Sequence, residues 1–116
     1  MPTDQNRFPK EERLLKRADF LRLSSEGQKV HVPHFIVLSS RSDTPCSRVG
    51  ITVSRKVGNA VVRNRVKRLV REFCRHNRRS PGTDYSIIAK PGSGILHYLQ
   101  VCRELEKAFA RLAGER

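Results

Sequence analysis

The strongest structural signal in this sequence is a helical repeat of apolar residues inside a very basic stretch. Between Asn59 and Asn77, apolar residues recur at i, i+4, i+7, i+8 and i+11, a spacing that lines one face of an α-helix. These residues are Val62, Val66, Leu69, Val70 and Phe73. Asn59 is a favoured N-cap, because its side-chain oxygen can accept a hydrogen bond from the first turn. The pattern predicts a helix from Asn59 to about Asn77 that packs on a core through this face.

The other sides of this predicted helix are almost entirely cationic. Residues 55–79 hold ten of the 24 Lys and Arg residues of the chain and one acidic residue, Glu72. The polar residues between the apolar positions are Arg63, Asn64, Lys67, Arg68, Arg71 and Arg75. A helix face that is merely solvated usually mixes charges of both signs, whereas these like charges repel one another. Since a polyanion would relieve the repulsion, the helix is predicted to bind one, with a solvated face as the alternative.

The overall charge supports the same prediction. The chain has 116 residues, and we expect residues 1–116 to form a single domain with one modest core. Its formal net charge of +13 indicates a phosphate backbone or an anionic membrane as partner. No apolar run approaches the ~20 residues that span a bilayer. Residues 1–13 lack the apolar segment of a secretory signal, so we expect a cytoplasmic protein with a mobile N-terminal arm.

The chain before the basic helix predicts one helix and three strands. Apolar residues at helical spacing predict a first helix over residues 17–26, which ends at Gly27 in a left-handed cap. Residues 28–40 alternate and then become continuously apolar, and Pro33 divides them into two strand segments joined by a bend or tight turn. Residues 49–53 alternate again, which predicts a third strand leading directly into the basic helix.

After the basic helix, one further strand and one further helix are predicted. Residues 85–89 form an apolar strand between two turn signals that contain Pro and Gly. From Ile95 the apolar residues return to helical spacing, and one face is formed by Leu99, Cys102, Leu105, Phe109 and Leu112. The resulting order of helix, three strands, basic helix, strand and helix is an α+β fold, in which helices cover a four-stranded sheet.

No constellation of residues in the sequence has the spacing of a catalytic or metal site. Cys46, Cys74 and Cys102 are far apart and are predicted to be reduced thiols, with Cys74 packed beside the apolar face. The four histidines are separated in sequence, and the carboxylates, Asp19 and Asp84 among them, are not expected to cluster. We therefore expect no catalytic residue and no metal ligand in this chain, which disfavours a protein-only nuclease.

Among polyanions, RNA fits the predicted fold best. A membrane-bound helix would expose its apolar face, which is needed here to cover the sheet. DNA readers of the helix-turn-helix type are built mainly from helices, whereas this chain has four predicted strands. A sheet with an adjacent aromatic residue and a rim of Arg and Lys suits single-stranded RNA, whose bases stack while its phosphates are held electrostatically. The prediction is an RNA-binding protein that binds neither membrane nor DNA, and a ribosomal or other structural RNA is an alternative target.

The longest specific motif in the chain covers residues 48–72 and reads RVGITVSRKVGNAVVRNRVKRLVRE. This run resembles the signature of the bacterial ribonuclease P protein component, including its Arg-Asn-Arg core at residues 63–65. Upstream residues agree with the same family, Phe20 and Phe35 among them. The resemblance covers about residues 13–89, while the last helix agrees mainly in position.

The resemblance implies a protein subunit that assists a catalytic RNA in removing the 5′ leader from precursor tRNA. In that family, magnesium ions (Mg2+) held chiefly by the RNA carry out the cleavage, and the protein binds the RNA subunit and the single-stranded leader. The residues implied to contact RNA are Arg55, Lys56, Arg63, Asn64, Arg65, Lys67, Arg68 and Arg71. The implied leader-binding cleft lies between the first helix, the sheet and the basic helix, and it contains Phe20, Arg63, Asn64 and Lys67.

The resemblance also implies an unusual topology and one departure from the family. The family fold has a left-handed crossover between the strands that flank the basic helix, against the general right-handed preference. Family members often have a second aromatic residue one helical turn after the position of Phe20, and this sequence has Ser24 there. A thinner stacking platform for the leader is therefore implied in this chain.

Overall fold

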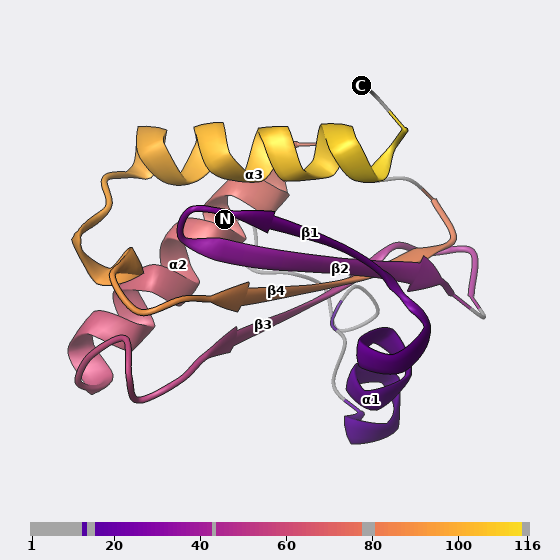
Figure 1. Ribbon diagram of the computed structural model, residues 1–116, viewed down its shortest axis with the longest axis horizontal. Coiled ribbons are helices and arrows are strands. Elements are labelled where there is room, and N and C mark those ends of the chain that lie inside the picture. Colours follow the sequence, from indigo (N-terminus) through magenta and orange to yellow (C-terminus); the bar gives the residue numbers. More distant parts are fainter. Residues whose placement is uncertain (1–12, 14–15, 43, 78–80, 115–116) are drawn as a thin grey trace, which may run out of the picture.

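The part of the chain that the computed structural model describes contains three α-helices, one 3₁₀-helix and four strands (Figure 1). The described residues are 13, 16–42, 44–77 and 81–114. In chain order the elements are α1 (Arg17–Glu26), β1 (Gln28–Val32), β2 (Phe35–Arg41), β3 (Arg48–Val53), α2 (Ala60–His76), β4 (Thr83–Ala89), the 3₁₀-helix η3 (Ser93–Ile95) and α3 (Tyr98–Leu112). This order confirms the predicted α+β fold.

The four strands form one mixed sheet in the order β1-β2-β4-β3. β1 and β2 make an antiparallel hairpin in which Val32 pairs with Phe35, so Pro33 lies in the turn, outside the ladder. β4 pairs antiparallel with β2 and parallel with β3. The parallel pair is joined through α2 by a left-handed crossover, as the resemblance implies, although right-handed crossovers dominate in proteins (Figure 1).

α2 and α3 cover one face of the sheet and enclose the main core. Phe35 of β2 and Val70 of α2 are fully buried there, because alternate strand residues and one helical stripe point to the same layer. Three aromatic rings close the layer, with the Phe109 ring centroid 5.5 Å from that of Phe73 and 4.9 Å from that of Tyr85. The predicted apolar face of the basic helix is therefore its buried face.

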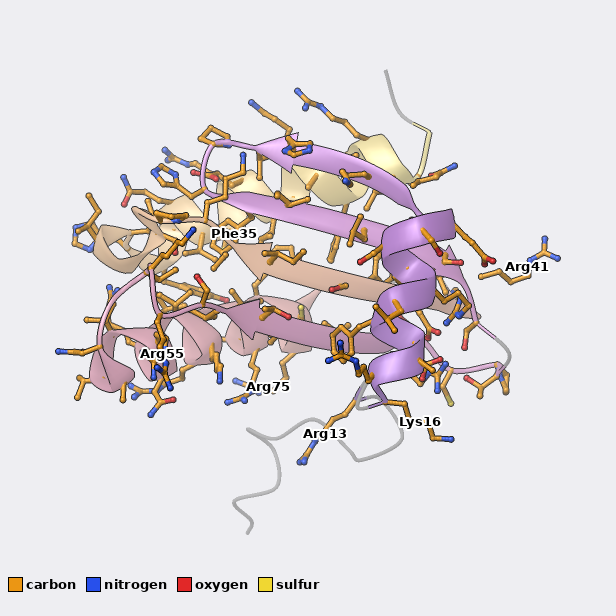
Figure 2. The ribbon with its side chains drawn as sticks, turned by 60° about the horizontal axis from the view of Figure 1, so that its bottom comes forward. Arg13, Lys16, Phe35, Arg41, Arg55 and Arg75 are labelled. Atoms are coloured by element: carbon orange, nitrogen blue, oxygen red, sulfur yellow. The ribbon has the colours of Figure 1, made fainter. Side chains whose placement is uncertain are left out.

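α1 lies on the opposite face of the sheet, over β2 and β4 (Figure 2). Its contact is small, with Leu23 of α1 and Leu38 of β2 buried and with Phe20 and Ile88 packed beside them. α1 is short and crosses the strands near one end, so among the described helices none covers most of this face (Figure 2).

The last helix starts three residues after the point at which its apolar pattern begins. α3 begins at Tyr98 rather than at Ile95, because residues 93–95 form the separate 3₁₀-helix and His97 is the N-cap. The His97 amide donates a hydrogen bond to Gln100 Oε1 at 2.8 Å, which completes a capping box. Leu99, predicted on the apolar face, is exposed instead.

The predicted left-handed conformation of Gly27 is wrong. Gly27 caps α1, but its φ is −76° and its backbone is extended. Space, and not a positive φ, requires glycine there: a Cβ atom would lie 2.6 Å from the carbonyl oxygen of Leu23 and 2.7 Å from that of Ser39.

The predicted N-terminal arm, residues 1–13, lies outside the described residues except for Arg13, which forms an isolated bridge with Val49 of β3. Among the residues that are described, no helix is both long and apolar enough to cross a membrane. Cys46, Cys74 and Cys102, all of them described, form no disulfide bond, and Cys74 packs in the main core.

Candidate RNA interface

Local sequence determines where α2 starts and which of its faces is buried. Asn59 is the N-cap, and its side-chain oxygen accepts a hydrogen bond from the Val62 amide at 3.0 Å, as predicted. Val66, Val70 and Phe73 are buried in the main core. The polar side of α2 is thereby directed to the outside of the molecule.

The outer stripe of α2 consists of three exposed residues, Asn64, Arg68 and Arg71. Their spacing of three and four residues places them on one side of the helix. The side chains of Arg68 and Arg71 form no hydrogen bond or ion pair with a described residue. Arg55 and Lys56, in the turn before α2, are exposed as well, and Figure 2 shows Arg55 near the start of this helix. These residues together present several unneutralised positive charges.

Arg65 is bound within the protein. Its guanidinium group donates hydrogen bonds to the carbonyl oxygens of Gly94, at 3.0 Å, and Leu96, at 2.7 Å. These bonds fasten the first half of α2 to η3 and to the segment before α3. RNA contact by Arg65 stays a prediction, but the position of its side chain is determined by the protein.

Arg63 and Lys67 lie on the flank of α2 that is roughly opposite Arg65, because successive helical residues are turned by about 100°. Both are half-buried, and Arg63 donates a hydrogen bond to the carbonyl oxygen of Gly58 at 2.9 Å. Since Arg65 faces η3 and α2 packs against β3, this opposite flank lies at the outer edge of β3. These two cations therefore border the edge of the sheet.

The C-terminal end of α2 is partly neutralised by Glu72. Its carboxylate accepts hydrogen bonds from Arg75 at 2.7 Å and from His76 at 2.9 Å. Hydrogen bonds from Arg75 and then His76 hold the pKa of Glu72 below its ordinary value, so this group is ionised at neutral pH. The free positive charge of α2 is therefore concentrated in its first two thirds.

Phe20, the predicted leader-stacking residue, lies on α1 and hence on the face of the sheet opposite α2. Its ring is half-buried and packs with Leu23, Leu38 and Ile88. Ser24, one turn further along α1, is exposed. The predicted site residues of α2 and of the turn before it therefore lie on one side of the sheet, and Phe20 lies on the other side.

A buried carboxylate, which the sequence analysis missed, fastens α1 to the sheet. Asp84 of β4 is 0% exposed and accepts hydrogen bonds from Arg22 at 2.6 Å and from Arg48 at 2.9 and 2.7 Å. Asp19 lies 3.5 Å from Arg22 and 3.8 Å from Arg48. The expectation that Asp19 and Asp84 do not cluster is therefore wrong, because the fold brings α1 over β4 and two arginines compensate both carboxylates. The sequence signal for such a buried ion pair is a single carboxylate at the start of an otherwise apolar strand.

Two features of the described residues bear on the predicted site residues, the spacing of possible metal ligands and the position of one cavity. In the described ranges of the chain, no three His, Cys, Asp or Glu side chains lie close enough together to hold a metal ion. A cavity of about 460 Å³ lies where β2 ends and β4 begins. The residues that line it include Glu26, Ser39, Arg41, Thr83 and Tyr85. None of the residues predicted to contact RNA lines this cavity.

These features define a single-domain α+β protein that presents a cationic helix beside a mixed sheet. A family model described as Ribonuclease P matches residues 8–113. The chain belongs to the ribonuclease P family.

Relatives and solved structures agree along most of the chain. The ribonuclease P protein component of Geotalea uraniireducens is 50% identical over 106 residues, which cover 90% of this chain and 94% of the relative. That of Desulforapulum autotrophicum is 49% identical over 107 residues, with coverage of 90% and 92%. The RNase P protein of Staphylococcus aureus superposes with a TM-score of 0.79 at 34% identity over 88% of this chain and 94% of that one. The Thermotoga maritima protein gives 0.78 at 34% identity, with coverage of 86% and 96%.

Proposed function

We propose that this chain binds the catalytic RNA subunit of ribonuclease P and the single-stranded 5′ leader of precursor tRNA. The observation that carries the proposal is the outer stripe of α2, in which Arg68 and Arg71 are exposed and make no ion pair with a described residue. Arg55 and Lys56 extend the same positive surface. Like charges held close together on a rigid helix repel one another, and the phosphates of an RNA backbone relieve that repulsion.

Family membership supplies the coarser part of this function. The chain is a protein component of ribonuclease P, the ribonucleoprotein endonuclease of tRNA processing. We propose in addition that magnesium ions held chiefly by the RNA subunit supply the hydrolytic chemistry, while this chain supplies binding. We also propose that it acts in the cytoplasm and contacts neither DNA nor a membrane.

The proposed path of the leader runs from the α1 face of the sheet to the outer edge of β3. Phe20 offers the accessible part of its ring for stacking with a base on the α1 face. Arg63 and Lys67 offer positive charge at the edge of β3, with Asn64 beside them on α2. A single strand that passes over β3 would reach both sites, because neighbouring strands are only about 4.8 Å apart.

Affinity purification from the native cells tests the proposal. The tagged chain, recovered at moderate salt, is expected to bring with it one abundant structured RNA, and the complex is expected to trim precursor tRNA at the 5′ end. Recovery of ribosomal RNA alone, without trimming activity, would instead assign the chain to structural RNA binding.

The salt dependence of RNA binding tests the outer stripe itself. The Arg68→Ala/Arg71→Ala variant is expected to reduce the slope of log K against log salt by about 1.4–1.8, because each of the two lost phosphate contacts releases about 0.7–0.9 fewer counterions. The measurement is the affinity for the transcribed RNA subunit over a series of monovalent salt concentrations.

A matched control for this variant lies on α3. Arg103 and Lys107 are exposed on α3, so Arg103→Ala/Lys107→Ala removes the same number of charges away from the outer stripe. Its slope should equal that of the wild type. An unchanged slope for the Arg68/Arg71 variant would exclude the outer stripe from the RNA interface.

A further inference from the structure

An exposed apolar pair adjoins the outer stripe of α2. The large apolar side chains that are strongly exposed in the described part of the chain are Leu21, Val61, Ile95 and Leu99. Val61, in the first turn of α2, is 77% exposed, and Ile95, in η3, is 82% exposed. α2 and η3 are in direct contact, so these two residues lie in one region of the surface.

Arg65 and Val62 hold this region together. The Arg65 guanidinium donates to the carbonyl groups on either side of Ile95, at 3.0 and 2.7 Å. The backbone of η3 rests directly on α2, since a Cβ atom added at Gly94 would lie 2.7 Å from Val62 Cγ1. Val61 precedes Arg65 by four residues and therefore lies on the same side of the helix. We refer to Val61 and Ile95 as the apolar patch.

The apolar patch is continuous with the outer stripe. Val61, Asn64 and Arg68 are spaced at i, i+3 and i+7, so they follow one another along one side of α2. Val and Ile are β-branched and stiff at χ1, so Val61 and Ile95 lose little conformational freedom when a partner covers them. The helix thus presents a rigid apolar end next to unneutralised arginines.

We infer that the apolar patch binds unpaired bases of the RNA subunit whose phosphates lie on the outer stripe, an inference that rests on the proposed function. An unpaired nucleotide combines a flat base, which can pack on apolar groups, with a negative phosphate, which matches this arrangement of apolar and cationic side chains. A second copy of the chain matches it poorly, because each copy has a net charge of +13. Two side chains also bury far less than the roughly 1,200–2,000 Å² of a stable protein interface.

The test compares the wild type with a Val61→Ala/Ile95→Ala variant in binding to the transcribed RNA subunit at several salt concentrations. The variant should bind about tenfold more weakly at every salt concentration, with an unchanged slope, because lost apolar burial releases no counterions. Dimethyl sulfate probing should show unpaired bases of the RNA that are protected by the wild type and modified in the complex with the variant.

Leu21→Ala is the matched control, since it removes an exposed apolar side chain from α1, and it should bind the RNA subunit as the wild type does. Thermal melting should be nearly unchanged in all these variants because the replaced side chains are exposed. Wild-type affinity of the Val61/Ile95 variant, or a change in its salt slope, would overturn the inference. Loss of self-association with intact RNA binding would overturn it in favour of a protein interface. Failure of the wild type to bind the RNA subunit would instead refute the proposed function, and the inference with it.

Discussion

Replacement of Asp84 by alanine is expected to lower the free energy of unfolding by about 3–5 kcal/mol, the cost of breaking a buried ion pair from one side. Asp84 is fully buried and accepts three hydrogen bonds from Arg22 and Arg48. Its removal leaves two guanidinium groups without their shared acceptor and loosens α1 from β4. Chemical denaturation of the wild type and the variant measures the difference.

The control for Asp84→Ala is Glu72→Ala, which also removes a carboxylate with two close basic partners. The Glu72 side chain is 38% exposed, so its ion pairs with Arg75 and His76 are screened by water and are expected to contribute only about 0–1 kcal/mol. Equal losses in the two variants would show that burial of Asp84 has no special effect on stability.

The same carboxylate makes stability depend on acidic pH. Burial acts to raise the pKa of Asp84, but the hydrogen bonds from Arg48 and Arg22 outweigh it and hold this pKa below its ordinary value of 3.8. A group with a lowered pKa in the folded state contributes stability that is complete above its ordinary pKa and is lost as the pH falls through the lowered value. We expect the wild type to lose stability below about pH 4 more steeply than Asp84→Ala, as measured by denaturation at a series of pH values. Parallel pH curves would contradict this account.

In the assembled holoenzyme, Phe20→Ala is expected to weaken binding of precursor tRNA by about 1–3 kcal/mol and to leave binding of mature tRNA unchanged, if the ring stacks on a leader base. The accessible part of the half-buried ring supports this expectation. A general loss of stability in this variant would weaken binding of both tRNAs and would not change the ratio of the two affinities. Equilibrium binding of the two tRNAs measures the ratio.

Two variants on the same helix sharpen the Phe20 prediction. Leu21→Ala, at the neighbouring exposed position, should leave the ratio of affinities unchanged. Ser24→Phe places an aromatic ring one turn after Phe20 at an exposed position and should increase the preference for precursor tRNA. Equal weakening of precursor and mature tRNA by Phe20→Ala would make Phe20 a packing residue only.

Local patterns were sufficient to predict most elements of this fold. The boundaries of α2 follow from the Asn59 cap and a 3.6-residue apolar period, both of which act within a few residues. Pro33 marks the β1–β2 turn because proline cannot donate within the ladder. The left-handed crossover came from the family resemblance alone, since the general preference of strand connections is for the opposite hand.

Errors occurred where burial depends on a partner far away in sequence. Ile95 and Leu99 continue the apolar period of the last helix but are exposed, because a periodic pattern does not show which positions a neighbouring element covers. Asp19 and Asp84 meet on Arg22 and Arg48 only because α1 crosses β4, a contact between residues more than 60 positions apart.

The basic character of α2, its buried face and its proposed role as a polyanion-binding surface could be argued from residues 55–79 alone, because charge and helical period are local properties. The sequence alone could not show which cationic side chains of α2 are free of partners within the protein. Arg65 and Arg68 have the same side chain and are only three positions apart, yet Arg65 donates to the carbonyl groups of Gly94 and Leu96, about 30 residues away, and Arg68 is exposed. Long-range packing makes that distinction, since a hydrogen-bond partner is defined by position in space and not by position along the chain.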